Sequence, residues 1–175
     1  MAADIDLDDE QGDEPRWLTP EERAAWLAVT AFTTKLPSAL DAQLQRDAGL
    51  SFFEYMVLAV LSEQDDWTLQ MSDIAQGASA SLSRLSHTAT RLENKGYLVR
   101  TRCPGAGRRT NATLTQAGFD KVVESAPGHV ETVRRLFIDA VTPEELIAIR
   151  DGGRAVLRQI DAKDLYTDVA LGLRD

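Results

Sequence analysis

The change of hydrophobic period at Gly96 constrains the fold of this 175-residue chain more than any other feature. Before Gly96, apolar residues recur every three or four positions, which is typical of α-helices. After it, residues 97–102 and 111–114 have the composition of two short strands, and the segment between them, 103–107, is rich in turn-forming residues. Gly96 is expected to end the helix in a left-handed conformation, with Tyr97 as the next hydrophobic contact. The sequence therefore predicts a helix followed directly by a β-hairpin.

Two short helices joined by a tight turn are predicted just before this hairpin. The first runs from about Met71 to Gln76, and residues 77–79 form the turn. The second begins near Ala80, with Ser79 as its N-cap and an inward stripe of apolar residues: Leu82, Leu85, Ala89 and Leu92. This order is that of a helix-turn-helix, whose second helix can lie in the major groove of DNA.

Further helices are predicted on both sides of this unit from capping chemistry. Capping boxes pair Thr19 with Glu22, Ser51 with Glu54 and Thr142 with Glu145. They predict helices over about 20–46, 52–62 and 143–160, the second of them buried on most sides. Thr115 is expected to cap a long helix that Pro127-Gly128 kinks or interrupts. The fold class is thus mainly α with a small β-hairpin wing: a winged helix-turn-helix with a further helical region on either side, to which the resemblance described below assigns dimerisation.

Charge is distributed unevenly along the chain. The net charge is −9, and the first 14 residues carry seven acids and no base. Residues 79–110 instead carry seven bases and one acid, Glu93. A concentrated basic segment in an acidic chain suits an anion such as DNA, but it also fits a solvated charge run. Charge alone leaves both interpretations open.

The outward face of the second helix favours DNA. With its apolar stripe buried, that face is expected to carry only hydrogen-bonding side chains, none of them acidic: Ser83, Arg84, His87, Thr88 and Arg91. At the tip of the hairpin, Arg108 and Arg109 can enter a minor groove or bind phosphates.

Several classes of protein do not fit the sequence. A single cysteine, Cys103, excludes an internal disulfide framework and a multi-cysteine zinc site. No apolar run approaches the ~20 residues that span a bilayer, and the acidic N-terminus does not resemble a secretory signal. No Gly-rich phosphate loop or His-based metal spacing is present. We therefore expect a cytoplasmic protein that is not an enzyme and needs no cofactor, metal or membrane.

Together, these residues resemble the multiple antibiotic resistance regulator (MarR) family of winged-helix transcription factors. The resemblance is carried by residues 71–75 (MSDIA), 81–85 (SLSRL), 91–98 (RLENKGYL), 107–109 (GRR) and 114–118 (LTQAG). It implies a homodimer, formed by the first and last helices, that binds a palindromic operator in double-stranded DNA. Family members commonly repress transcription, and many respond to a small aromatic ligand. The expected organisation is a disordered acidic arm over 1–16, a dimerisation helix over 17–50, the winged helix-turn-helix over 51–115 and C-terminal dimerisation helices over 116–175.

The expected roles of the site residues follow from this arrangement. Arg84 is the main candidate for reading a base, since bidentate contact with guanine gives about 1–3 kcal/mol of discrimination. Ser81, Ser83, His87 and Thr88 are candidates for bases or phosphates, Arg91 and Lys95 for phosphates, and Arg108 and Arg109 for wing contacts. Ala106 departs from related wings, which often carry an acidic residue there. This departure keeps an alternative open: a winged-helix module for protein interaction or ligand sensing that lacks specific DNA binding.

Overall fold

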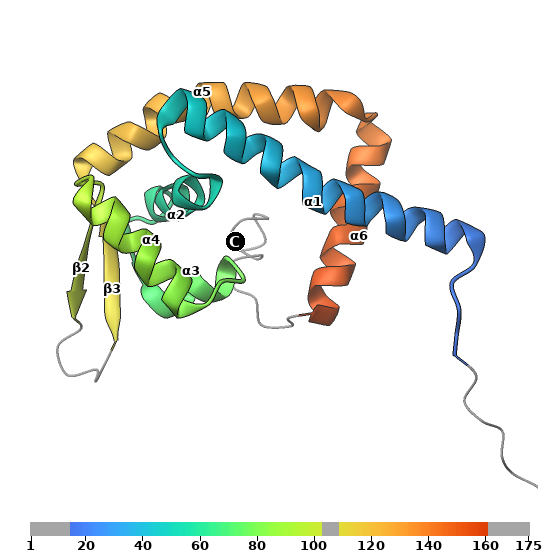
Figure 1. Ribbon diagram of the computed structural model, residues 1–175, viewed down its shortest axis with the longest axis horizontal. Helices are drawn as coiled ribbons and strands as arrows, with labels where there is room; N and C mark the ends of the chain where they lie inside the picture. The colour runs from blue at the N-terminus through green and yellow to red at the C-terminus, as the bar shows by residue number, and fades with distance from the viewer. Residues whose placement is uncertain (1–14, 103–108, 161–175) are drawn as a thin grey trace, which may run out of the picture. The chain divides into compact units, whose positions relative to one another are not determined.

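The computed structural model describes residues 15–102 and 109–160 (Figure 1). The first of its two units ends at Lys35 and the second begins at Leu36. Three sequence predictions fall outside the described residues: the acidic arm up to residue 14, the hairpin tip with Cys103, Ala106 and Arg108, and any structure beyond residue 160.

The first unit contains the start of the longest helix, α1 (Pro20–Ala48). The predicted capping box is confirmed, because the Thr19 N–H donates to Glu22 Oε2 at 2.8 Å and the Glu22 N–H donates to Thr19 Oγ1 at 3.2 Å. This part of α1 leaves large apolar side chains exposed, namely Trp26, Leu27, Val29 and Phe32. The helix continues through Pro37.

The core of the second unit surrounds α2 (Phe52–Ser62). Val57, Leu58 and Leu61 are buried, which confirms that this helix is central. Leu44 from the end of α1 and Leu50 from the following turn complete the same cluster. The Ser51 box is also confirmed, with the Glu54 N–H donating to Ser51 Oγ and the Ser51 N–H donating to Glu54 Oε2.

The helix-turn-helix consists of α3 (Met71–Gly77) and α4 (Leu82–Asn94). The predicted start of α4 is wrong by two residues. Ser79 has a positive φ of 46° within the turn, so it cannot open the helix. Ser81 is the N-cap instead, and its Oγ accepts from the Arg84 N–H at 3.2 Å. At the other end Gly96 has φ 76°, as expected for a left-handed terminus.

The strands form a three-stranded antiparallel sheet in the order β1-β3-β2. The predicted hairpin is β2 (Leu98–Arg102) and β3 (Thr110–Leu114), paired from Leu98↔Leu114 to Arg102↔Thr110. The additional strand β1 (Thr68–Gln70) was not predicted. It pairs with β3 along its whole length and joins the hairpin to the segment before α3.

Two long helices complete the described part of the chain. Thr115 caps α5 (Gln116–Leu136) as predicted, but Pro127 does not interrupt this helix. A single 3-10 turn (Ile138–Ala140) leads to α6 (Pro143–Ile160), which opens with the predicted Thr142 capping box. The mainly helical fold class with its small sheet is therefore confirmed. No helix within the two described ranges is both long and apolar enough to cross a membrane.

Candidate nucleic-acid interface

The second helix of the helix-turn-helix, α4, presents one buried face and one exposed face. Leu85, Ala89 and Leu92 are fully buried, as their spacing predicted. Ser83, Arg84, His87 and Arg91 are exposed, as predicted for the outward face, and the N-cap Ser81 is exposed as well. Because the face begins at the N-terminal end of α4, it has the position from which such helices contact base edges.

Thr88 corrects the sequence prediction for this face. It is only 2% exposed, so its predicted place on the outward surface is wrong. The side chain lies at the border of the helical stripe, where its hydroxyl accepts a hydrogen bond from Arg91 Nη2 at 3.2 Å. Thr88 is therefore a buried support for Arg91 and does not form part of the surface.

The cations on one side of α4 are held by α2. The Arg84 guanidinium lies 4.5 Å above the centre of the Phe53 ring, a cation–π geometry. Arg91 Nε donates to Glu54 Oε1 at 2.8 Å, and Lys95 Nζ lies 3.5 Å from Oε2 of the same carboxylate. The α2 helix thus orients Arg84 and Arg91 of α4 and Lys95, the C-cap residue of α4.

Glu54 is nearly buried at this junction and remains charged. Burial by itself would raise the pKa of its carboxyl group. The hydrogen bonds from Arg91 and the Ser51 N–H, together with the charges of Lys95 and Arg91, outweigh burial and lower that pKa. The hydrogen-bond donors around Glu54 thus stabilise the charged form of its buried carboxylate.

On the other side of α4, Arg100 of β2 links the wing to the helix. Its Nη2 and Nε donate to Glu93 Oε2 at 2.6 and 2.9 Å, and its backbone N–H donates to Oε1. The same guanidinium also reaches Ser86 Oγ at 3.2 Å and Thr90 Oγ1 at 2.9 Å. The hydrogen bonds from Arg100 lower the pKa of Glu93. Sequence reasoning gave Arg100 no role, because the pattern of a strand does not show which helix residues it faces.

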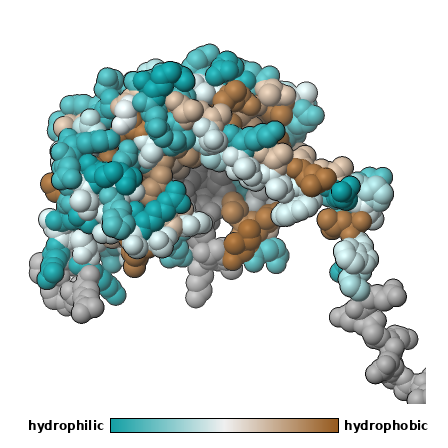
Figure 2. Space-filling view, viewed as in Figure 1, coloured by the Kyte–Doolittle hydropathy of each residue, from teal (hydrophilic) through white to brown (hydrophobic). Residues whose placement is uncertain are grey.

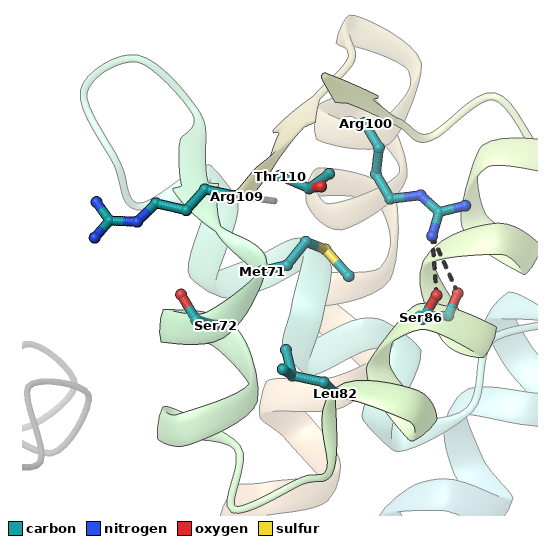
Figure 3. Close-up of a pocket in the computed structure, with 7 residues that line it drawn as sticks. All are labelled: Met71, Ser72, Leu82, Ser86, Arg100, Arg109 and Thr110. Carbon is teal, nitrogen blue, oxygen red and sulfur yellow. Dashed lines mark hydrogen bonds between the residues drawn. The ribbon is translucent and has the colours of Figure 1, made fainter. Parts of the chain in front are cut away.

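A hollow of about 540 Å³ lies between α3, α4 and the two hairpin strands. Figure 3 shows Met71 and Leu82 at its apolar side, the Arg100 side chain directed to Ser86, and Arg109 directed away from the helix. Arg109 is exposed, whereas Arg108 lies outside the described residues. Glu93, the sole acid of α4, is paired with Arg100. The polar groups on the exposed face of this helix are therefore hydroxyl, imidazole and basic groups, beside the exposed Leu82.

Comparison with known proteins identifies this arrangement. The sequence model of the MarR family matches residues 48–109, from the end of α1 to the start of β3. Sco3205, a MarR family transcriptional regulator from Streptomyces coelicolor solved in complex with DNA, is 40% identical and superposes with a TM-score of 0.79 over 84% of this chain and 92% of its own. The chain belongs to the MarR family.

Two further relatives agree with this assignment. AbsC, a MarR family transcriptional regulator also from S. coelicolor, is 36% identical with a TM-score of 0.77, over 83% of this chain and 98% of its own. The HTH-type transcriptional regulator YfiV of Bacillus subtilis is 28% identical over 82% of this chain and 88% of its own length. The protein is a DNA-binding transcriptional regulator of the MarR family and not an enzyme.

Proposed function

We propose that this MarR family regulator acts in the cytoplasm as a homodimeric repressor on a palindromic operator, with α4 of each copy in a major groove. Ser81, Ser83, Arg84 and His87 contact bases or nearby phosphates. Arg91 contacts phosphates, and Arg108 and Arg109 extend the contact from the wing. The main support is the exposed face of α4, where the acid of this helix is already paired with Arg100. No free carboxylate of α4 therefore opposes the DNA backbone.

Arg84 is the proposed base reader. Arg84→Ala should lower the ratio of specific to scrambled DNA affinity by about fivefold or more, because a bidentate guanine contact is lost. Arg91→Ala should weaken binding about equally on both DNAs and reduce the salt dependence. Fluorescence anisotropy with a site selected from random DNA measures both ratios. Equal ratios for Arg84→Ala and wild type would contradict the assignment.

The proposed dimer would cover apolar surface that the single chain leaves exposed. No residue of α6 is buried, and Ile149, Val156 and Ile160 recur at helical spacing on it. Figure 2 shows brown, apolar residues on part of α6. Taken by itself, the beginning of α1 also leaves Trp26 and Val29 exposed. Exposed apolar helix faces of this kind mark interfaces. The proposed assignment is therefore dimerisation by residues 17–50 and 116–175, with DNA binding by 51–115.

Light scattering coupled to gel filtration tests the dimer. Val156→Arg should yield a monomer with weakened operator binding, whereas Arg150→Ala, which removes an exposed pair with Asp151 on the same helix, should leave the dimer intact. Repression is tested by transcription in vitro from a promoter that overlaps the selected site. Fewer transcripts with added protein support repression, and more transcripts would indicate activation.

We further propose that a small aromatic ligand weakens operator binding. The support is the family resemblance together with the presence of a hollow beside α4 that Met71 and Leu82 line on its apolar side. Sodium benzoate is a suitable probe, added to the anisotropy assay at constant ionic strength with sodium acetate as the matched control. Release of DNA by benzoate alone supports a site for aromatic acids, and equal effects of both salts would contradict it.

A further inference from the structure

Leu82 is an apolar residue exposed at the position where α4 would meet DNA. Its spacing placed it in the core with Leu85, Ala89 and Leu92, and this expectation is wrong, since Leu82 is 58% exposed. The cause is the position of the helix start. Leu82 is the first residue of α4, directly after the Ser81 cap, and lies beyond the end of the core. Its side chain therefore keeps more than half of its surface exposed in the single chain.

The surroundings of Leu82 make it distinct among exposed apolar residues. It lines the hollow between α3, α4 and the hairpin, next to Met71 and opposite Arg100 and Arg109 (Figure 3). The exposed residues that follow it, Ser83, Arg84, Ser86 and His87, are all polar. The face of α4 thus combines one apolar contact point with several hydrogen-bonding groups.

A base edge offers one apolar group to such a side chain. In the major groove thymine carries a C5-methyl group, which cytosine lacks, and apolar side chains contact it. A leucine at the N-terminal end of the recognition helix cannot read a base by hydrogen bonding. We propose that Leu82 is a specificity-determining residue that contacts a thymine methyl group in each half-site. This inference rests on the proposed placement of α4 in the major groove.

Deoxyuridine provides a direct test, because it differs from thymidine only by the missing methyl group. A site selected from random DNA is prepared with each thymine in turn replaced by deoxyuridine in both half-sites. Wild-type affinity should fall by about fourfold per half-site at one position, the effect of one buried methyl group. For Leu82→Ala the same replacement should have no effect. Leu82→Ile, which retains an apolar side chain, should keep the penalty.

The control separates this contact from a general loss of binding. Ser83→Ala removes a neighbouring exposed hydroxyl and should keep the deoxyuridine penalty at the same position. The methyl contact is refuted if deoxyuridine lowers wild-type affinity at no single position, or if it lowers the affinities of Leu82→Ala and wild type equally. Leu82 then contacts sugar or solvent. If wild type does not distinguish the selected site from scrambled DNA, the proposed function itself fails. Thermal unfolding by circular dichroism verifies that each variant is folded.

Discussion

Arg91 Nε of α4 lies 2.8 Å from Oε1 of Glu54 in α2, so the recognition helix is fastened through its last turn to the helix behind it. Glu54 is 5% exposed and has two roles, because it also completes the capping box that starts α2. One carboxylate therefore sets both the beginning of the central helix and the orientation of α4. A regulator that reads DNA with rigid geometry needs such a connection.

Replacing Glu54 tests this connection. Glu54→Gln keeps the size of the side chain but removes the charge that Arg91 and Lys95 share, and we expect it to lower the free energy of unfolding by about 1–2 kcal/mol. Glu124→Gln is the matched control, because the Glu124 side chain is 72% exposed in its pair with Lys121. This substitution should lower the free energy of unfolding by less than about 0.5 kcal/mol. Urea denaturation measures both. Equal losses would show that Glu54 has no special structural role.

Arg100 should affect DNA binding without touching the base edges. Arg100→Ala frees the Glu93 carboxylate near the DNA backbone, so we expect a loss of affinity of about tenfold for specific and scrambled DNA alike. The double variant with Glu93→Gln should recover part of this loss, because the repelling charge is removed. Arg102→Ala, an exposed residue on the same strand, is the control. Anisotropy titrations measure the DNA affinity of each variant. If the double variant binds DNA no more tightly than Arg100→Ala alone, the charge argument is contradicted.

Capping residues explain why most helix boundaries could be predicted. Thr19, Ser51, Thr115 and Thr142 satisfy backbone N–H groups within a few residues of themselves, so their effect is visible in the sequence. Strand β1 could not be predicted in this way. Three residues are too few to show a period, and its partner β3 is more than 40 residues away along the chain.

The placement of the site residues could likewise be predicted only where it depends on local sequence. Ser83, Arg84 and His87 were placed correctly by the helical wheel, since the exposed direction of a helix follows from its buried stripe. Leu82 and Thr88 were misplaced because a wheel shows neither where the core ends along the helix axis nor which neighbour covers its border. The pairings of Arg84 with Phe53 and of Arg100 with Glu93 depend on tertiary packing, and no local pattern contains them.

Gly118 is expected to be essential for joining α5 to the winged unit. A Cβ at this position would lie within van der Waals overlap of Tyr97 O, at 2.1 Å, and of Leu114 Cδ1, at 2.7 Å. Gly118→Ala should therefore destabilise the fold by about 2 kcal/mol or more, as overpacking against backbone does. Gly128→Ala in the same helix meets only Gln43 Nε2 at 3.6 Å and should be neutral or stabilising. Thermal unfolding compares the two, and similar melting temperatures would contradict the close contact.

His129 of α5 should make stability depend on pH. Its ring centre lies 4.6 Å from that of Tyr55 in α2, and its buried Nδ1 has no hydrogen-bond partner among the described residues. Burial lowers the pKa of His129 below its usual value of 6.5. As the pH falls through 6.5, the unfolded chain binds the proton first, so stability is fully present above this value and decreases below it.

The measurement uses urea denaturation from about pH 7.5 to about pH 5. Glu54 and Glu93 do not account for a decrease of stability in this pH range. The pKa of each carboxyl group is lowered from 4.5, so its contribution to the free energy of unfolding is lost only in more acidic solution. His129→Phe keeps the ring packing and should flatten the decrease. His87→Gln, on the exposed face of α4, should retain it. If His129→Phe shows the same pH dependence as wild type, the proton uptake on unfolding arises from other groups.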